Sequence, residues 1–172
     1  MVRKTMLLAL LGLICSLTVK AQQFALVDME YILNRIPAYQ AAVQEMETLS
    51  AQWQKEIEAK NEEAQRLYES YQKNAETLSA EAKTTSENTI VAKEQEAAEL
   101  RKQYFGPEGE MIKKRQELIG PIQDEIYNAI KNISLEKGYD AVIDRASAQS
   151  LIFASPRIDI SNEVLSKLGY SI

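Results

Sequence analysis

The fold is decided by the stretch VAKEQEAAELRKQYFGPEGEMIKKRQELIGPIQDEIYNAIKNI, residues 91–133. An apolar residue recurs in it at intervals of seven, forming a ladder of Val91, Ala98, Phe105, Ile112, Ile119, Ile126 and Ile133. A sustained seven-residue apolar repeat predicts a helix whose seam faces a partner. The helical pattern extends from Ile36 to about Lys137, so most of the chain is expected to be helical.

A second heptad pattern predicts the outgoing helix of a hairpin, from Pro37 towards Asn74. Its seam is less regular, because Ser50, Lys60 and Asn74 stand where a tight coiled coil would place Leu or Ile. We therefore expect an arm held by modest packing that can bend or splay; the alternative is a rigid coiled coil with weak positions. The expected seam residues are Ile36, Tyr39, Val43, Met46, Ser50, Trp53, Ile57, Lys60, Ala64, Leu67, Tyr71, Asn74 and Leu78.

The turn of the hairpin is expected between residues 74 and 86. Ser79 with Glu81 resembles a helix start and would place the turn at residues 74–78. Thr84 with Glu87 forms a capping box and would place it at Lys83. We favour the first alternative.

Glycine and proline interrupt the returning helix twice. The heptad phase continues across both interruptions, so we interpret them as kinks in one helix and as hinges of the arm; the alternative is a true break at the first interruption. The expected hinge residues are Gly106, Pro107, Gly109, Gly120 and Pro121.

Short apolar segments flank the arm. Residues 24–28 predict a strand, or alternatively the first turn of a helix, and residues 29–35 a short helix. Residues 139–144 and 151–154 predict two strands that form a hairpin. Ser161 is expected to cap a final helix with Val164, Leu165 and Leu168 facing inward.

The pattern divides the chain into a helical arm, residues 37–137, and a small body, residues 22–36 and 138–172. The fold class is thus α+β but mostly α, with a long antiparallel hairpin projecting from a β body. Folding the arm back places the strand at 24–28 beside that at 139–144. So small a body cannot cover both faces of its sheet. We therefore expect an oligomer joined through the body.

The first 21 residues have the three parts of a cleaved secretory signal, which predicts export. The competing reading, a membrane anchor, is disfavoured because the apolar run is too short to span comfortably. The three parts are basic Arg3 and Lys4, the apolar run 6–14, and Val19 and Ala21 before the cleavage point.

The composition excludes several kinds of function. The formal net charge is −5, and without Arg3, Lys4 and Lys20 of the first 21 residues it is −5 − 3 = −8, which disfavours binding to nucleic acid. The chain has no histidine, and its single cysteine is Cys15. We find no phosphate-binding glycine loop, metal-ligand cluster or nucleophile–base pair, so we expect no enzyme, no nucleotide and no cofactor.

The layout of signal, strand, long helical hairpin, two strands and short helix resembles the Skp (OmpH) family of periplasmic chaperones. The resemblance spans the whole mature chain. It is carried by FALVDME (24–30), FGPEG (105–109), IYNAI (126–130), YDAVID (139–144) and DISNEVL (159–165).

The resemblance implies a homotrimer with a shared β body, in which three helical arms enclose unfolded outer-membrane proteins in the periplasm. The best-known members of this family are strongly basic, whereas this chain is acidic. Contact with membrane or lipopolysaccharide is therefore not carried over to it.

A holdase chaperone needs many weak contacts and no reaction. Aromatic rings on a mobile arm provide such contacts. The alternative function is a structural or adaptor coiled-coil protein of the cell envelope that binds a folded partner. The residues expected to contact a client are Trp53, Tyr68, Tyr71, Tyr104 and Phe105, although Trp53, Tyr71 and Phe105 also occupy positions that favour packing within the seam.

Overall fold

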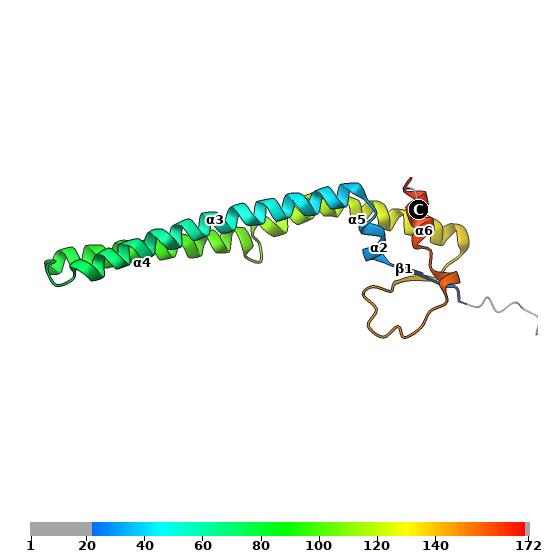
Figure 1. The fold of residues 1–172 in the computed structure, drawn as a ribbon. Coiled ribbons are helices and arrows are strands. Elements are labelled where there is room, and N and C mark those ends of the chain that lie inside the picture. The colour runs from blue at the N-terminus through cyan, green and yellow to red at the C-terminus, as the bar shows by residue number, and fades with distance from the viewer. Residues whose placement is uncertain (1–21, 171–172) are drawn as a thin grey trace, which may run out of the picture.

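The computed structural model describes residues 22–170, so the predicted signal sequence lies outside the described residues. Helix α3 runs out along an arm, α4 and α5 return beside it, and the other elements gather at one end (Figure 1). The prediction of a mostly helical fold with a long hairpin on a small β body is confirmed. The elements are β1 (Phe24–Val27), α2 (Met29–Leu33), α3 (Pro37–Asn74), α4 (Ala80–Phe105), α5 (Glu110–Lys137), β2 (Ala141–Asp144), the 3₁₀ helix η1 (Pro156–Ile158) and α6 (Ser161–Lys167).

Helix α3 sets the length of the arm. Its 38 residues span about 57 Å at 1.5 Å per residue. Every expected seam position except Asn74 is buried or half-buried, so the seam of the outgoing helix is confirmed. Among residues 22–170, none of the helices combines the length and apolar content that membrane crossing requires.

The ladder of the returning helix does not form one continuous seam, and that prediction is wrong. Val91 and Ile112 are 49% and 53% exposed, whereas Ile126 is fully buried. In α4 the neighbouring row, with Ile90 and Ala97, is buried instead. The ladder is buried only towards the base, because there α5 packs against the body as well as against α3.

The turn of the hairpin lies after Asn74, where α3 ends, and before α4 begins at Ala80. Ser79 caps α4, and its hydroxyl accepts a hydrogen bond of 3.2 Å from the backbone N–H of Ala82. The first alternative for the turn is therefore confirmed.

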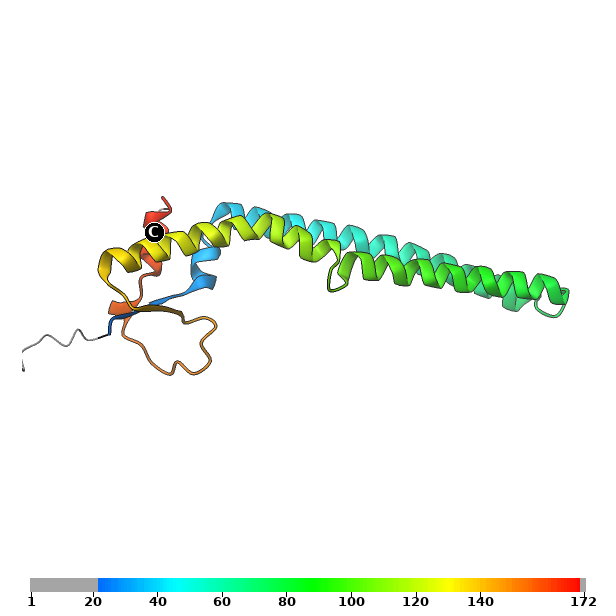
Figure 2. The same ribbon diagram turned by 180° about the vertical axis from the view of Figure 1, so that it is seen from behind.

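The returning helix breaks at Gly106, so the interpretation of this interruption as a kink is wrong and the alternative is confirmed. A Cβ atom at Gly106 would lie 2.3 Å from the carbonyl oxygen of Lys102, and one at Gly109 would lie 2.8 Å from two carbonyl oxygens. The glycines permit the tight loop that projects from the arm in Figure 2. At the second interruption α5 continues through Gly120 and Pro121.

The body contains a two-stranded parallel sheet in which β1 pairs with β2, with Phe24 opposite Ala141 and Val27 opposite Asp144. This confirms the strand predicted at residues 24–28 and its position beside residues 139–144. One face of the sheet packs on α5, α2 and α6. The buried core consists of Ala25, Val27, Ile32, Ile36, Ile122, Ile126, Ala129, Ile133, Ile160, Val164 and Leu165.

The predicted hairpin of residues 139–144 with 151–154 is wrong, because residues 151–154 form no strand. The chain here forms a loop that is anchored at both ends. The guanidinium of Arg145 binds Asp28, which follows β1, at 2.9 Å and Asp159, at the far end of the loop, at 3.4 Å. Backbone N–H groups of Arg145 and Ile160 donate to the carbonyl oxygens of Val27 at 2.8 Å and Leu26 at 2.9 Å, so both ends of the loop are tied to β1.

The final helix begins one residue earlier than predicted. Ser161 lies inside α6 and does not cap it. The carboxylate of Asp159 instead accepts hydrogen bonds from the backbone N–H of Ser161 at 2.9 Å and from its hydroxyl at 2.6 Å. Val164 and Leu165 are buried as predicted, and Leu168 packs partly buried against the core.

Candidate functional site

Three aromatic residues form a cluster in the middle of the arm. The rings of Trp53 on α3 and Tyr104 on α4 stack with their centroids 4.9 Å apart and an angle of 7° between the planes. Phe105 meets Trp53 edge to face, at 6.1 Å and 79°. Aromatic pairs of this kind contribute about 0.5–1.5 kcal/mol beyond burial. The cluster therefore holds the two helices together next to the break in the returning helix.

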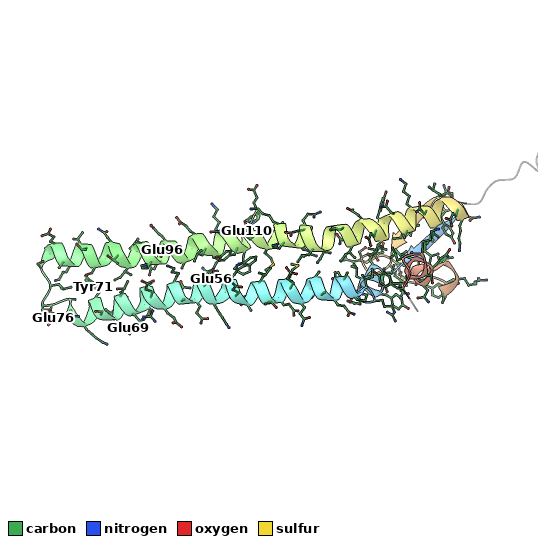
Figure 3. All side chains as sticks on the ribbon, turned by 90° about the horizontal axis from the view of Figure 1, so that it is seen from above. Glu56, Glu69, Tyr71, Glu76, Glu96 and Glu110 are labelled. Carbon is green, nitrogen blue, oxygen red and sulfur yellow. The ribbon has the colours of Figure 1, made fainter. Side chains whose placement is uncertain are left out.

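Two tyrosine hydroxyls cross the arm to glutamates. The Tyr104 hydroxyl donates to Glu56 at 2.6 Å, and the Tyr71 hydroxyl donates to Glu87. These carboxylates raise the pKa of Tyr104 and Tyr71. In Figure 3 Tyr71 lies between the two helices near the tip. Both rings are thus used for packing within the arm, and their contact with a client stays a prediction.

Tyr68 differs from the other four expected contact residues. Its side chain is 44% exposed, and its hydroxyl accepts a hydrogen bond of 2.8 Å from Gln72 on the same helix. The exposed part of the ring is accessible to a ligand on the surface of the arm.

The charged residues in the seam are paired across the two helices. Lys60 binds Glu96 at 2.8 Å, and Lys93 binds Glu63 and Glu96, both at 3.3 Å. The hydrogen bonds from Lys60 and Lys93 lower the pKa of Glu96, and those to Glu63 and Glu96 raise the pKa of Lys93. Lys60 therefore interrupts the apolar seam but also joins the two helices through its ion pair with Glu96. This network was not predicted from the sequence, although opposite charges at matching positions of the two helices could have indicated it.

These pairs lie on one side of the arm, which we call the paired flank: Glu56, Glu63 and Glu96 with their partners Tyr104, Lys93 and Lys60. Each of the three glutamates directly precedes a buried or half-buried seam residue, namely Ile57, Ala64 and Ala97. Successive residues of a helix are rotated by about 100° around its axis. Residues that come just before a seam residue therefore lie on one side of the seam, and residues that come just after one lie on the other side.

The opposite side of the arm, which we call the open flank, carries Gln54, Asn61 and Tyr68 of α3 with Arg101 and Phe105 of α4. Gln54, Ile57, Glu58, Asn61, Arg101 and Phe105 line a groove of ≈ 460 Å³ there. Tyr68 follows Asn61 by seven residues and therefore lies on the same side of α3. Val91 and Ala98 precede Phe105 at intervals of seven and extend this flank along α4.

The expected hinge residues occupy two different settings. Gly106, Pro107 and Gly109 form the loop between α4 and α5, where the backbone N–H of Gly109 donates to the carbonyl oxygen of Gly106 at 2.9 Å. Gly120 is buried inside α5, and Pro121 is exposed on it. Movement at either place stays a prediction.

The body leaves apolar side chains uncovered on the face of the sheet away from the core. Phe24 and Ile143 are exposed on the two strands, and in the following loop Ile152 and Phe153 are 100% and 83% exposed. Within residues 22–170, β2 pairs on one edge only. No three His, Cys, Asp or Glu side chains of this part of the chain lie close enough together to hold a metal ion.

Comparison with known proteins finds similarity over both arm and body. The sequence model of the family "Outer membrane protein (OmpH-like)" matches residues 23–168. "Chaperone protein Skp" of Yersinia enterocolitica is 26% identical over 160 residues, covering 92% of this chain and 93% of that protein. The protein of the same name from Photorhabdus laumondii is 24% identical over 169 residues, covering 96% and 99%.

The crystal structure of an OmpH-like protein from Caulobacter crescentus has a similar fold. Its TM-score is 0.65 at 14% sequence identity, and the match covers 88% of this chain and 86% of that one.

Proposed function

The chain belongs to the OmpH-like family, and on that premise we propose that it is a periplasmic chaperone that binds unfolded outer-membrane proteins and prevents their aggregation without ATP. The observation that carries the proposal is the extent of the family match, which includes the complete arm together with the body. Relatives that are similar over nearly their whole length are named as chaperones, which supports this function.

The open flank is the client-binding surface in this proposal. It presents exposed Tyr68 and Val91 and the half-buried ring of Phe105. A holdase must bind many sequences weakly, and scattered apolar side chains at a groove provide such contacts. Trp53, Tyr71 and Tyr104 act mainly by keeping the arm intact, and reach a client at their ring edges.

Three copies share the body in this proposal, with residues 22–36 and 138–172 in the body and 37–137 in the arm. A chain on its own exposes Phe24 and Ile143 on the outer face of its sheet, the free edge of β2 and the apolar segment 151–153. If segment 151–153 of one copy adds as a strand to β2 of the next, the edges are paired and the apolar face is covered. Three arms then project from one end and enclose a space for the client.

The arm adjusts to clients of different size at the proposed hinges. The loop of Gly106, Pro107 and Gly109 leaves a short non-helical joint between α4 and α5. Gly120 and Pro121 remove one helical hydrogen bond within α5 and allow a second, smaller bend.

The test is dilution of a urea-unfolded outer-membrane β-barrel protein into buffer without nucleotide, with light scattering as the readout. A threefold molar excess of the trimer should suppress the scattering. Unchanged scattering would contradict the proposal and favour the structural or adaptor alternative. The molar mass of the free protein, measured by multi-angle scattering, should be three times that of the mature chain; a monomer would contradict the shared body.

A further inference from the structure

The α3 side of the open flank is rich in carboxamides. In order it carries Gln54, Glu58, Asn61, Gln65 and Tyr68, of which only Glu58 is charged. Consecutive members of this set are three or four positions apart in the sequence, so all five lie on one surface of the helix. The three amide side chains are all exposed.

These amides have few hydrogen-bond partners within the described part of the protein. Gln54 donates weakly to the Ser50 hydroxyl at 3.4 Å, and Gln65 donates to Glu69 at 3.0 Å. Within residues 22–170, the carboxamide oxygens of Gln54, Asn61 and Gln65 accept no hydrogen bond from another side chain or the backbone. Each carboxamide offers two donors and two acceptor positions, the same kinds of group as a peptide unit.

The paired flank has the opposite character. Its glutamates Glu56, Glu63 and Glu96 are held by Tyr104, Lys93 and Lys60. Any ligand that bound there by charge would have to displace these partners. The open flank needs no such displacement, and its groove carries one charge of each sign, Glu58 and Arg101, so its net charge is zero and it matches an uncharged ligand.

We infer that the carboxamides of Gln54, Asn61 and Gln65 bind the main chain of an extended, unfolded β-barrel segment, while the groove at Phe105 takes its apolar side chains. This inference rests on the proposed function and specifies how the same flank recognises its ligand. An unfolded chain exposes unpaired N–H and C=O groups at every residue except proline. Carboxamides can satisfy both kinds of group whatever the sequence, so the arm binds many clients through what they share.

The groove brings amide groups and apolar side chains together at one place. Gln54 and Asn61 stand at its rim, and Ile57 and Phe105 are apolar lining residues. A segment lying along the groove therefore meets amide and apolar surface together. The alternating side chains of an outer-membrane strand, apolar on one face and polar on the other, suit such a surface.

The test compares two triple variants of the complete mature protein. Gln54→Met, Asn61→Leu and Gln65→Met keep the size of the side chains and remove their hydrogen bonds. The control makes the same three changes at exposed amides away from the open flank, Gln52→Met, Asn88→Leu and Gln95→Met. Affinity for a fluorescently labelled, unfolded outer-membrane β-barrel protein is measured by anisotropy in low urea, with helicity and oligomer mass as checks on folding.

We expect the open-flank variant to bind at least tenfold more weakly than the wild type, and the control to bind within twofold. Equal or tighter binding by the open-flank variant would overturn the inference, since it would show that apolar surface alone decides affinity. Equal loss in both variants would overturn it as well. The single variant Asn61→Leu, which replaces a poorer helix former by a better one, should still lose two- to threefold if the triple variant does not fold. Failure of the wild type to bind would contradict the proposed function instead.

Discussion

Two isoleucines of the heptad ladder, Ile112 and Ile126, should differ sharply when each is replaced by alanine. In the sequence they occupy equivalent positions, fourteen residues apart. In the structure Ile126 is 0% exposed in the body core, whereas Ile112 is 53% exposed on α5. Comparing the two variants therefore tests whether equivalent heptad positions in the sequence are equally important for packing in the structure.

The magnitude follows from burial. Ile126→Ala removes three buried carbon atoms and leaves a cavity in the core of the body, a change that costs about 2–5 kcal/mol. Ile112→Ala removes exposed surface and should change the free energy of unfolding by less than about 0.5 kcal/mol. For a chain of 172 residues, the loss at Ile126 corresponds to a fall in Tm of roughly 5–20 °C.

Thermal unfolding followed by circular dichroism, at one fixed protein concentration, measures both variants. The concentration must be matched because the stability of an oligomer depends on it. We expect a large fall in Tm for Ile126→Ala and almost none for Ile112→Ala. Equal falls would refute the conclusion that the ladder packs only at the base.

Three further changes test other parts of the structure. Asp28→Asn removes a carboxylate whose pKa is lowered below its ordinary 3.8, chiefly by the backbone N–H of Tyr31. The stability that this carboxylate adds is present above pH 3.8 and is lost as the pH falls through its lower pKa in the folded protein, so the variant should be less stable in urea at pH 7 and approach the wild type below about pH 4. A difference in stability that widens in acid would contradict this. Gly106→Ala places a Cβ atom 2.3 Å from a carbonyl oxygen and should cost about 1–3 kcal/mol; a higher Tm would show that the loop is not required. Ile152→Ser combined with Phe153→Ser should lower the molar mass in light scattering from trimer towards monomer while helicity is kept, since both side chains are exposed in the single chain; an unchanged mass would place the interface elsewhere.

The sequence was a good guide where one residue decides a local conformation or where an apolar repeat has one partner. Ser79 located the start of α4, and Pro37 the start of α3. The seam of α3 was predicted correctly at every position except Asn74, because beyond Ile36 and Tyr39, which meet the body core, its residues face the returning arm. The short strands at 24–27 and 141–144 and their pairing followed from folding that arm back.

The returning helix was harder to predict because its partner changes along its length. Near the tip it packs on α3 through Ile90 and Ala97, and at the base it packs on the body through Ile126 and Ile133. A constant heptad count cannot distinguish these two surfaces. The same count continued across Gly106, where the backbone is extended (φ −67°, ψ 172°) and ends α4, because the following Pro107 disfavours a helical conformation at the residue before it.

The sequence identified the residues of the candidate site but not how they contact one another. Aromatic residues of the arm were identified from the sequence, but only the structure shows that Trp53 and Tyr104 stack on each other while Tyr68 remains exposed. The two flanks depend on which glutamates find partners across the hairpin. Pairs such as Lys60 with Glu96 are 36 residues apart, and their meeting requires the register of the two helices.

The most direct test of the account is photo-cross-linking of a client to neighbouring positions on α3. The photoreactive residue p-benzoylphenylalanine replaces Tyr68 on the open flank or, as the control, Gln52, whose side chain is exposed and donates to Glu56 of the paired flank at 3.2 Å. Irradiation with an unfolded outer-membrane β-barrel protein should give a strong adduct at Tyr68 and little at Gln52. Equal adducts at both positions, or a stronger one at Gln52, would contradict the claim that the open flank of the arm holds unfolded clients.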